Sequence, residues 1–416
     1  MERKLIRNAS ELVTLAGKAP RFGADMKEIG LIKDGAVYME DGVIRRVGRT
    51  EEVLREGIPE DTEILDAAGK TVLPGFVDSH THFIFGGYRA EEFGWRLKGD
   101  SYMSIMERGG GINATVEKTR AASLEELKQA GRDRLRTMLE FGVTTVEGKS
   151  GYGLDTETEI RQLQAMKELE EEGPLEIVRT FLGPHSVLPE YKGREREFLD
   201  LMLQKVMPEV KRQGLAEFAD IFTEKNVFSI EDSRYYLNAA KAMGFALKIH
   251  ADEMVSLGGA SLAAETGCIS ADHLLKASDE GIRALKASGT IATLLPATAF
   301  CLKEEFAPAR KMIDAGCAVA MASDLNPGSC FTNSIPLLMA LGCIYMNMSI
   351  EEVITALTIN GAAAVGRQDR IGSLEPGKQA DIVILRFPSI SFIPYHTAIN
   401  LVETVIKKGE VVRRKA

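Results

Sequence analysis

The sequence predicts an α/β protein built on a TIM-type (β/α)8 barrel, with a small composite β-sandwich domain formed by both ends of the chain. Two observations predict this class. Short apolar runs alternate about eight times with amphipathic helical stretches through the middle of the chain, whereas the two ends carry short strands separated by hairpin turns. An open doubly wound sheet fits the alternation almost as well and is the alternative fold.

The two chain ends predict the composite domain. Near the N-terminus, apolar runs at 12–15, 36–39 and 43–47 are separated by Asp34-Gly35 and Asp41-Gly42, dipeptides that are typical of tight hairpins. Near the C-terminus, a turn cluster at 372–377 precedes an apolar run and a final pair of strands. Neither end can bury a good core alone, so we expect residues 1–69 and 372–416 to combine, with residues 70–371 forming the barrel.

The middle of the chain supplies the strands and helices of the predicted barrel. Ser123 and Glu126 form a capping box that begins one helix, and residues 157–172 repeat apolar side chains along one helical face. The strands are too apolar for a sheet with one exposed face, which indicates strands that are covered on both sides. Candidate barrel strands lie at 72–78, 143–147, 177–183, 219–223, 246–250, 268–272, 290–295 and 318–322.

Composition excludes several classes of protein. The 416 residues are 45% hydrophobic and 27% charged, which is typical of a globular chain. The net charge of -9 comes without a basic stripe, which argues against nucleic-acid binding. The longest uncharged stretch is interrupted by polar residues and proline, and the polar start does not resemble a signal peptide. The 5 cysteines show no CxxC spacing. We therefore expect a cytoplasmic protein that binds neither nucleic acid nor membranes.

Histidines follow the ends of the predicted strands. His80 and His82 follow the first strand, His250 and His273 end later strands, and Asp324 follows the eighth. Active sites of barrel enzymes lie at this end of the strands. Residues i and i+2 of an extended segment point the same way, so both imidazoles of His80 and His82 can face one ion.

These residue types suit metal-assisted hydrolysis. Three neutral imidazoles and one carboxylate favour zinc or iron and leave a position for water, whose pKa a metal lowers from about 15.7 to about 7. His273 is a candidate proton shuttle or a further metal ligand, and Glu253 lies where it could reach a substrate. The structural alternatives are a core histidine for His250, a turn or helix-cap residue for Asp324 and a loop glutamate for Glu253.

Longer motifs identify a family. The segments 73–82 and 372–381 are typical of the metal-dependent amidohydrolase superfamily as a whole and do not select a substrate. With the more selective motifs, found in order along the chain, the sequence resembles the imidazolonepropionase family over essentially its full length. These motifs are Arg96-Leu97-Lys98-Gly99, Gly109-Gly110-Gly111-Ile112-Asn113, Lys149-Ser150-Gly151-Tyr152-Gly153-Leu154, Pro189-Glu190-Tyr191-Lys192-Gly193, His250-Ala251-Asp252-Glu253 and Asp324-Leu325-Asn326-Pro327-Gly328-Ser329.

The resemblance implies an activity and a set of site residues. It implies opening of the cyclic amide of 4-imidazolone-5-propanoate by a metal-activated hydroxide to give N-formimidoyl-L-glutamate, in histidine degradation. It implies one divalent or trivalent ion, zinc or iron, and a homodimer. The implied metal ligands are His80, His82, His250 and Asp324. The implied substrate contacts are Arg89, Tyr102, Tyr152, His185, Glu253, Asn326, Gly328 and Ser329. The mechanism that we predict assigns the proton transfers to Glu253, His273, Asp324 and His185.

The chemistry of these side chains agrees with a small substrate that carries a carboxylate tail. Arg89 offers a permanently charged planar fork that can bind a carboxylate through two hydrogen bonds, although a surface salt bridge is its structural alternative. Tyr102 and Tyr152 can add hydroxyl donors. Two other functions stay open: an aminohydrolase acting on a purine or pyrimidine, which shares the histidine pattern, and a barrel that serves as a non-catalytic scaffold.

Overall fold

A parallel sheet forms the centre of the structure. The computed structural model describes residues 2–100, 104 and 108–414. Its central sheet has the strand order β16-β15-β14-β13-β11-β10-β9-β8, with the short β12 also pairing with β13. The strands are β8 (Phe76–Asp78), β9 (Val143–Lys149), β10 (Glu176–Phe181), β11 (Phe218–Ala219), β12 (Phe222–Thr223), β13 (Ala246–Ala251), β14 (Ser270–His273), β15 (Ile291–Leu294) and β16 (Val319–Met321).

Backbone hydrogen bonds between the segments that follow β8 and β16 complete the ring. The Asp324 N–H donates to the His80 carbonyl at 3.0 Å, and the His82 N–H donates to the Leu325 carbonyl at 2.9 Å. The first and eighth strand positions therefore adjoin, as a barrel requires and an open sheet does not allow. The predicted (β/α)8 barrel is confirmed, and the doubly wound alternative is wrong.

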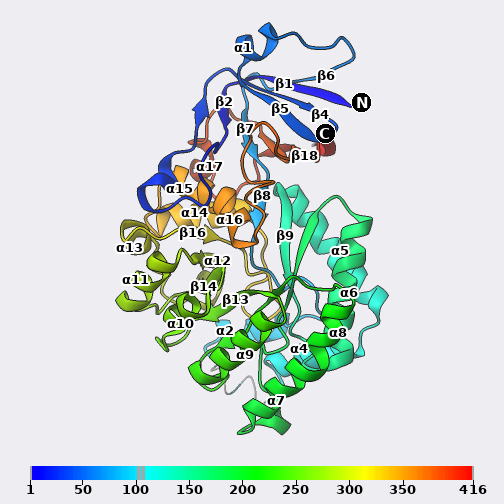
Figure 1. Cartoon of the computed structure of the whole chain (residues 1–416), viewed down its shortest axis with the longest axis vertical. Helices are drawn as coiled ribbons and strands as arrows, with labels where there is room; N and C mark the ends of the chain where they lie inside the picture. The colour runs from blue at the N-terminus through cyan, green and yellow to red at the C-terminus, as the bar shows by residue number, and fades with distance from the viewer. Residues whose placement is uncertain (1, 101–103, 105–107, 415–416) are drawn as a thin grey trace.

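Helices surround the barrel (Figure 1). Ser123 begins α5 with the predicted capping box, in which its Oγ accepts from the Glu126 N–H. Helix α6 buries Leu163, Met166 and Leu169, as its apolar repeat predicts. The helices that follow the barrel strands are α2 (Ala90–Leu97), α4 (Ile112–Ala121), α5 (Leu124–Glu140), α6 (Thr156–Glu172), α7 (Glu195–Leu201), α8 (Met207–Arg212), α9 (Ile230–Ala242), α10 (Gly259–Thr266), α11 (Asp279–Ser288), α12 (Pro296–Leu302), α13 (Ala309–Asp314), α14 (Ile335–Ile344), α15 (Ile350–Leu357) and α16 (Ile359–Ala364).

Strands from both chain ends lie side by side at one end of the barrel (Figure 1). One sheet has the order β5-β4-β1-β6 and the other β19-β18-β17-β7-β2-β3, so the second sheet mixes N-terminal and C-terminal strands. Ile6, Val37, Leu374 and Ile382 share the core of this composite domain. Its elements are β1 (Arg3–Ala9), β2 (Glu11–Val13), β3 (Leu31–Ile32), β4 (Gly35–Glu40), β5 (Val43–Arg49), α1 (Thr50–Arg55), β6 (Glu63–Asp66), β7 (Thr71–Pro74), β17 (Ile382–Leu385), α17 (Phe392–Tyr395), β18 (Val402–Lys407) and β19 (Glu410–Arg414).

The first predicted barrel strand is two strands. The sequence predicts one strand at 72–78, but β7 pairs in the composite sheet and only β8 lies in the barrel. The switch occurs at Gly75, whose N–H donates to the Asp381 carbonyl, while the next N–H, from Phe76, donates to Gly142 in the barrel. The apolar run continues because both halves are buried, so hydrophobicity alone does not mark the break.

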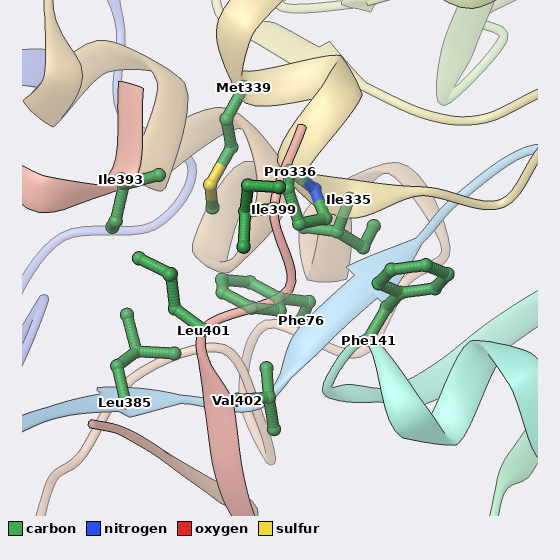
Figure 2. Close-up of a pocket in the computed structure, with 10 residues that line it drawn as sticks. All are labelled: Phe76, Phe141, Ile335, Pro336, Met339, Leu385, Ile393, Ile399, Leu401 and Val402. Atoms are coloured by element: carbon green, nitrogen blue, oxygen red, sulfur yellow. The ribbon is translucent and has the colours of Figure 1, made fainter. Parts of the chain in front are cut away.

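Apolar side chains fill the contact between the barrel and the C-terminal segment. Figure 2 shows Phe76, Phe141 and Met339 from the barrel facing Leu385 and Leu401, and the small pocket among them has no polar side chain in its lining. This pocket therefore offers no group that could orient a polar ligand, and it belongs to the packing that joins the two parts.

We expect Gly75→Ala to destabilise the protein, because an added Cβ would lie 2.3 Å from Thr144 Oγ1. Overpacking at such a site costs about 1–3 kcal/mol of unfolding free energy, measurable by urea denaturation. Gly94→Ala in α2 is the matched control, since an added Cβ there meets nothing within 4 Å. In the double variant Gly75→Ala/Thr144→Ala, the smaller side chain at 144 should recover part of the unfolding free energy that Gly75→Ala loses. If the losses of the two single variants simply add in the double variant, the proposed clash is contradicted.

Candidate functional site

Histidines from separate strands meet at one end of the barrel. The residues His80, His82, His250 and His273 expose at most 3% of their surface. Their ring nitrogens form overlapping groups in which all the candidate ligand atoms lie within 4.8 Å of one another; these groups are His80 with His250 and His273, His82 with His185 and His250, and His80 with His82 and Asp324. The structure thus brings together the residues that the sequence predicts for a metal centre, including the alternative ligand His273.

Asp324 lies at the seam of the barrel. Its Oδ1 is 3.5 Å from Nε2 of His80 and equally far from Nε2 of His82, and its Oδ2 accepts from Thr298 Oγ1 at 2.6 Å. Burial raises the pKa of Asp324 to about 7, against the hydrogen bond from Thr298. Its φ of +50° is unusual for a residue with a side chain.

Carboxylates face the other side of two of these rings. Asp272 Oδ2 lies 2.6 Å from His80 Nδ1, and Asp220 Oδ2 lies 3.1 Å from His250 Nδ1. Nε2 of His80 and both ring nitrogens of His250 are buried without a hydrogen-bond partner, so the contact of His250 with Asp220 is electrostatic rather than a hydrogen bond. Buried nitrogens without partners are costly unless something else binds them, and a carboxylate behind the ring is the usual support of a metal-binding histidine. The residues present therefore fit a bound metal ion.

The imidazoles are suited to be neutral ligands. Burial lowers the pKa of His80, His82 and His250 well below the usual value. Burial also lowers the pKa of His185 and of His273 to about 4. A neutral ring keeps one nitrogen lone pair free, which is the form that binds a metal or accepts a proton.

Glu253 lies beside His273 at the edge of the histidine cluster. Its Oε2 is 3.5 Å from His273 Nδ1. Burial, with smaller contributions from Asp324 and Glu224, raises the pKa of Glu253 to about 8. The carboxyl group can therefore hold a proton at neutral pH, which suits a general acid more than a solvent-facing loop residue.

Tyr152 and His185 line the site next to His82. His185 stacks on His82 with ring centroids 4.8 Å apart, and the Tyr152 ring lies 5.2 Å from His185. Burial raises the pKa of Tyr152, with the charge of Asp324 adding to the shift and that of Arg89 opposing it. Tyr102, predicted as a further contact, lies outside the described residues.

Arg89 is held against the loop that follows β16. Its Nε donates to Glu92 Oε2 at 2.9 Å, and both side chains are largely buried, so this ion pair is not the surface salt bridge that was the structural alternative for Arg89. A Cβ added to Gly328 would lie 2.2 Å from Arg89 Nη1, so a larger residue at this position would require the guanidinium to move. Asn326 Oδ1 accepts from the N–H groups of Gly328 and Ser329, which shapes the loop.

Sequence reasoning missed the carboxylates that support the histidines. Asp272 lies in β14 and Asp220 lies directly after β11; both are fully buried, as is Glu147 in β9. The available signal was a charged residue inside an otherwise apolar strand, which requires a charged partner in the folded protein. The partners come from other strands, so the pattern along the chain does not identify them.

The model of the Amidohydrolase family matches residues 71–412, which include the whole barrel. The chain belongs to the amidohydrolase family. Among its curated amidohydrolase relatives, an imidazolonepropionase of Parabacteroides distasonis is 58% identical, and the alignment covers 98% of each chain. An imidazolonepropionase of Clostridium tetani is 56% identical over 99% of this chain and 98% of its own. The recognition of the imidazolonepropionase branch is confirmed.

Solved structures support the amidohydrolase fold. A mutant of atrazine chlorohydrolase from Arthrobacter aurescens, complexed with zinc and atraton, superimposes with a TM-score of 0.76 at 16% identity, covering 99% of this chain and 95% of that one. Guanine deaminase of E. coli gives a TM-score of 0.73 at 16% identity, covering 100% of both chains. At these identities the likeness shows the fold alone.

Among the described helices, none combines the length and apolar character needed to cross a bilayer.

The raised pKa of Glu253 predicts a pH-dependent stability. The pKa of Glu253 is about 8 in the folded protein, against an ordinary value of 4.5. As pH rises from 4.5 to 8, the unfolded chain therefore loses this proton while the folded protein keeps it. The free energy of unfolding falls over this range. In chelator-treated protein, Glu253→Gln should therefore gain unfolding free energy relative to the parent between pH 5 and pH 8, by about 1 kcal/mol or more. A difference that stays constant across this range in urea denaturation would contradict burial of an uncharged Glu253.

Proposed function

We propose that the chain is a metal-dependent cyclic amide hydrolase that converts 4-imidazolone-5-propanoate to N-formimidoyl-L-glutamate, a step of histidine degradation. The observation that carries this proposal is the 52–58% identity to imidazolonepropionases over nearly the whole chain. The buried cluster of imidazoles supports it, because hydrolysis of a stable amide at neutral pH needs an activated water molecule.

His80, His82, His250 and Asp324 would hold the metal, with His273 as the alternative ligand. When bound, zinc or iron would supply Lewis acidity, which lowers the pKa of water and stabilises negative charge on a carbonyl oxygen. The support for this donor set is the convergence of the ring nitrogens and the Asp324 carboxylate, together with the absence of hydrogen-bond partners at Nε2 of His80 and of His250.

Arg89 is proposed to bind the propanoate tail. Glu92 fixes the guanidinium from one side, and Gly328 leaves space beside Nη1, so the fork is held in one orientation before substrate arrives. Tyr152 and His185 would contact the ring, and Asn326 would shape the loop whose Gly328 and Ser329 contact substrate or product. Tyr102 is proposed as a further contact on the basis of the family resemblance.

The remaining side chains are proposed to move protons. Water attacks the ring carbonyl carbon, and its proton passes to His273 or Asp324. The carbon–nitrogen bond of the cyclic amide then breaks, and Glu253 donates a proton to the departing nitrogen; His185, the other candidate for this proton transfer, has a pKa of about 4 and must first gain a proton itself. Glu253 is suited to this step because its pKa of about 8 keeps a proton available at neutral pH. The products are a carboxylate and a formimidoyl amine.

The two alternatives from the sequence have weaker support. Guanine deaminase, an aminohydrolase, is 16% identical to this chain, and at that identity the similarity shows the fold but not the substrate. A non-catalytic scaffold has no need for a cluster of buried imidazoles.

An ultraviolet assay that follows loss of the imidazolone chromophore, with cytosine and guanine as alternative substrates, tests all three functions. Turnover of cytosine or guanine without imidazolone turnover would overturn the proposal.

His80→Ala should abolish both metal binding and imidazolone turnover, because His80 takes part in three of the four groups of candidate ligand atoms that the described residues form. Elemental analysis and the ultraviolet assay measure the two effects. His396→Ala is the matched control, since His396 stacks on Phe387 in the composite domain with ring centroids 4.5 Å apart. A chelator should inactivate the parent protein, and added zinc or iron should restore it. Full activity of metal-free His80→Ala protein would refute the metal centre.

Arg89→Ala should raise KM for the imidazolone about 10- to 100-fold with a smaller change in kcat, since a charge-assisted hydrogen bond contributes about 1.5–3 kcal/mol. An imidazolone that lacks the propanoate tail serves as the internal control, because the parent and the variant should turn it over with similar kcat/KM. An unchanged KM for the full substrate would show that Arg89 does not bind its carboxylate.

A further inference from the structure

Five charged side chains form a closed cluster inside the barrel. They are Glu147 and Lys149 from β9, Asp220 after β11, Lys248 from β13 and Asp272 from β14, and none exposes any of its side chain. Two cations thus meet three anions in a place from which water is excluded. Burying so many charges is costly and stabilises a fold poorly, so the cluster calls for a functional explanation.

The two lysines connect all three carboxylates. Lys149 Nζ lies 2.7 Å from Asp220 Oδ2 and 3.0 Å from Glu147 Oε1, and 3.5 Å from Asp272 Oδ2. Lys248 Nζ lies 2.8 Å from Glu147 Oε2 and 3.8 Å from Asp272 Oδ2, and it donates to the Ser79 carbonyl at 3.0 Å. Lys248 therefore also binds the backbone next to His80.

The carboxylate oxygens that contact the lysines are the same ones that face the histidines. Asp272 Oδ2 lies 2.6 Å from His80 Nδ1, and Asp220 Oδ2 lies 3.1 Å from His250 Nδ1. The second oxygen of each group is also held: Asp272 Oδ1 accepts from Ser270 Oγ, and Asp220 Oδ1 accepts from the Ile221 N–H. Neither carboxylate can rotate without breaking contacts on both oxygens.

The cluster also contains a set of atoms that could compete for a cation. His80, Glu147 and Asp272 offer ligand atoms within 4.8 Å of one another, on the Nδ1 side of the His80 ring. The ammonium groups of Lys149 and Lys248 lie within 3.8 Å of these carboxylates. Fixed positive charge disfavours a metal ion there and leaves the Nε2 side of the ring for it.

We infer that Lys149 and Lys248 are positioning residues of the metal centre, which hold Asp272 and Asp220 against His80 and His250 so that the Nε2 atoms of both rings face the metal ion. The inference rests on the metal centre of the proposed function and assigns the lysines no contact with substrate. Removing either ammonium group should lower the affinity for the metal ion, while the protein stays folded.

Zinc affinity of Lys149→Met and of Lys248→Met tests the inference, measured on the zinc-loaded protein by competition with a chelating indicator. We expect a loss of about tenfold or more in each variant, the size typical of residues that support metal ligands. Lys407→Met is the matched control, because Lys407 forms a buried ion pair with Asp381 at 2.7 Å in the composite domain. Urea denaturation of the metal-free proteins gives the cost in stability of all three.

The double variant Glu147→Gln/Lys149→Met guards against loss of folding in the single variants, because it keeps the net charge of the cluster while removing the ammonium beside Asp220. It should also lose about tenfold or more in zinc affinity. Folded lysine variants that bind zinc as tightly as the parent and Lys407→Met would overturn the inference and leave the proposed function intact. A parent protein that binds no zinc or iron would instead refute the metal centre itself.

Discussion

Closure of the barrel is the constraint on which the site depends. The backbone hydrogen bonds between His80 and Asp324 and between His82 and Leu325 join the first strand position to the eighth. The same bonds bring two imidazoles to one carboxylate from a segment more than two hundred residues away. Because the seam of the sheet and the predicted metal centre are the same structure, the barrel cannot open there without dispersing the ligands.

Burial decides the chemical state of these groups. The interior removes water from the imidazoles, lowers their pKa and leaves neutral nitrogens that need another partner. The same burial raises the pKa of Glu253 and so keeps a proton on an acid at the edge of the cluster. Burial therefore leaves the imidazole lone pairs free to bind a metal and also keeps Glu253 protonated, so that it can protonate a departing nitrogen.

The ion pair of Arg89 and Glu92 lies next to the last loop of the barrel. Glu92 holds Arg89 where Gly328 leaves space, so the charge proposed to bind the substrate tail is fixed by the first and last loops of the barrel. The composite domain, by contrast, joins the barrel through apolar contacts such as those of Phe76 with Leu401 (Figure 2). Polar loops carry the proposed chemistry, whereas apolar packing, with a buried ion pair of Lys407 and Glu176, joins the two parts.

The sequence by itself determined the repeating strand and helix pattern, the composite nature of the end domain and the positions of His80, His82, His250 and Asp324 at strand ends, because hydrophobic periodicity and local motifs are written along the chain. Only the tertiary structure decided that the strand at 72–78 breaks at Gly75 and that Asp220 and Asp272 support the histidines. These features depend on hydrogen bonds and charge pairs between strands distant in sequence, and such partners exist only once the sheet has closed.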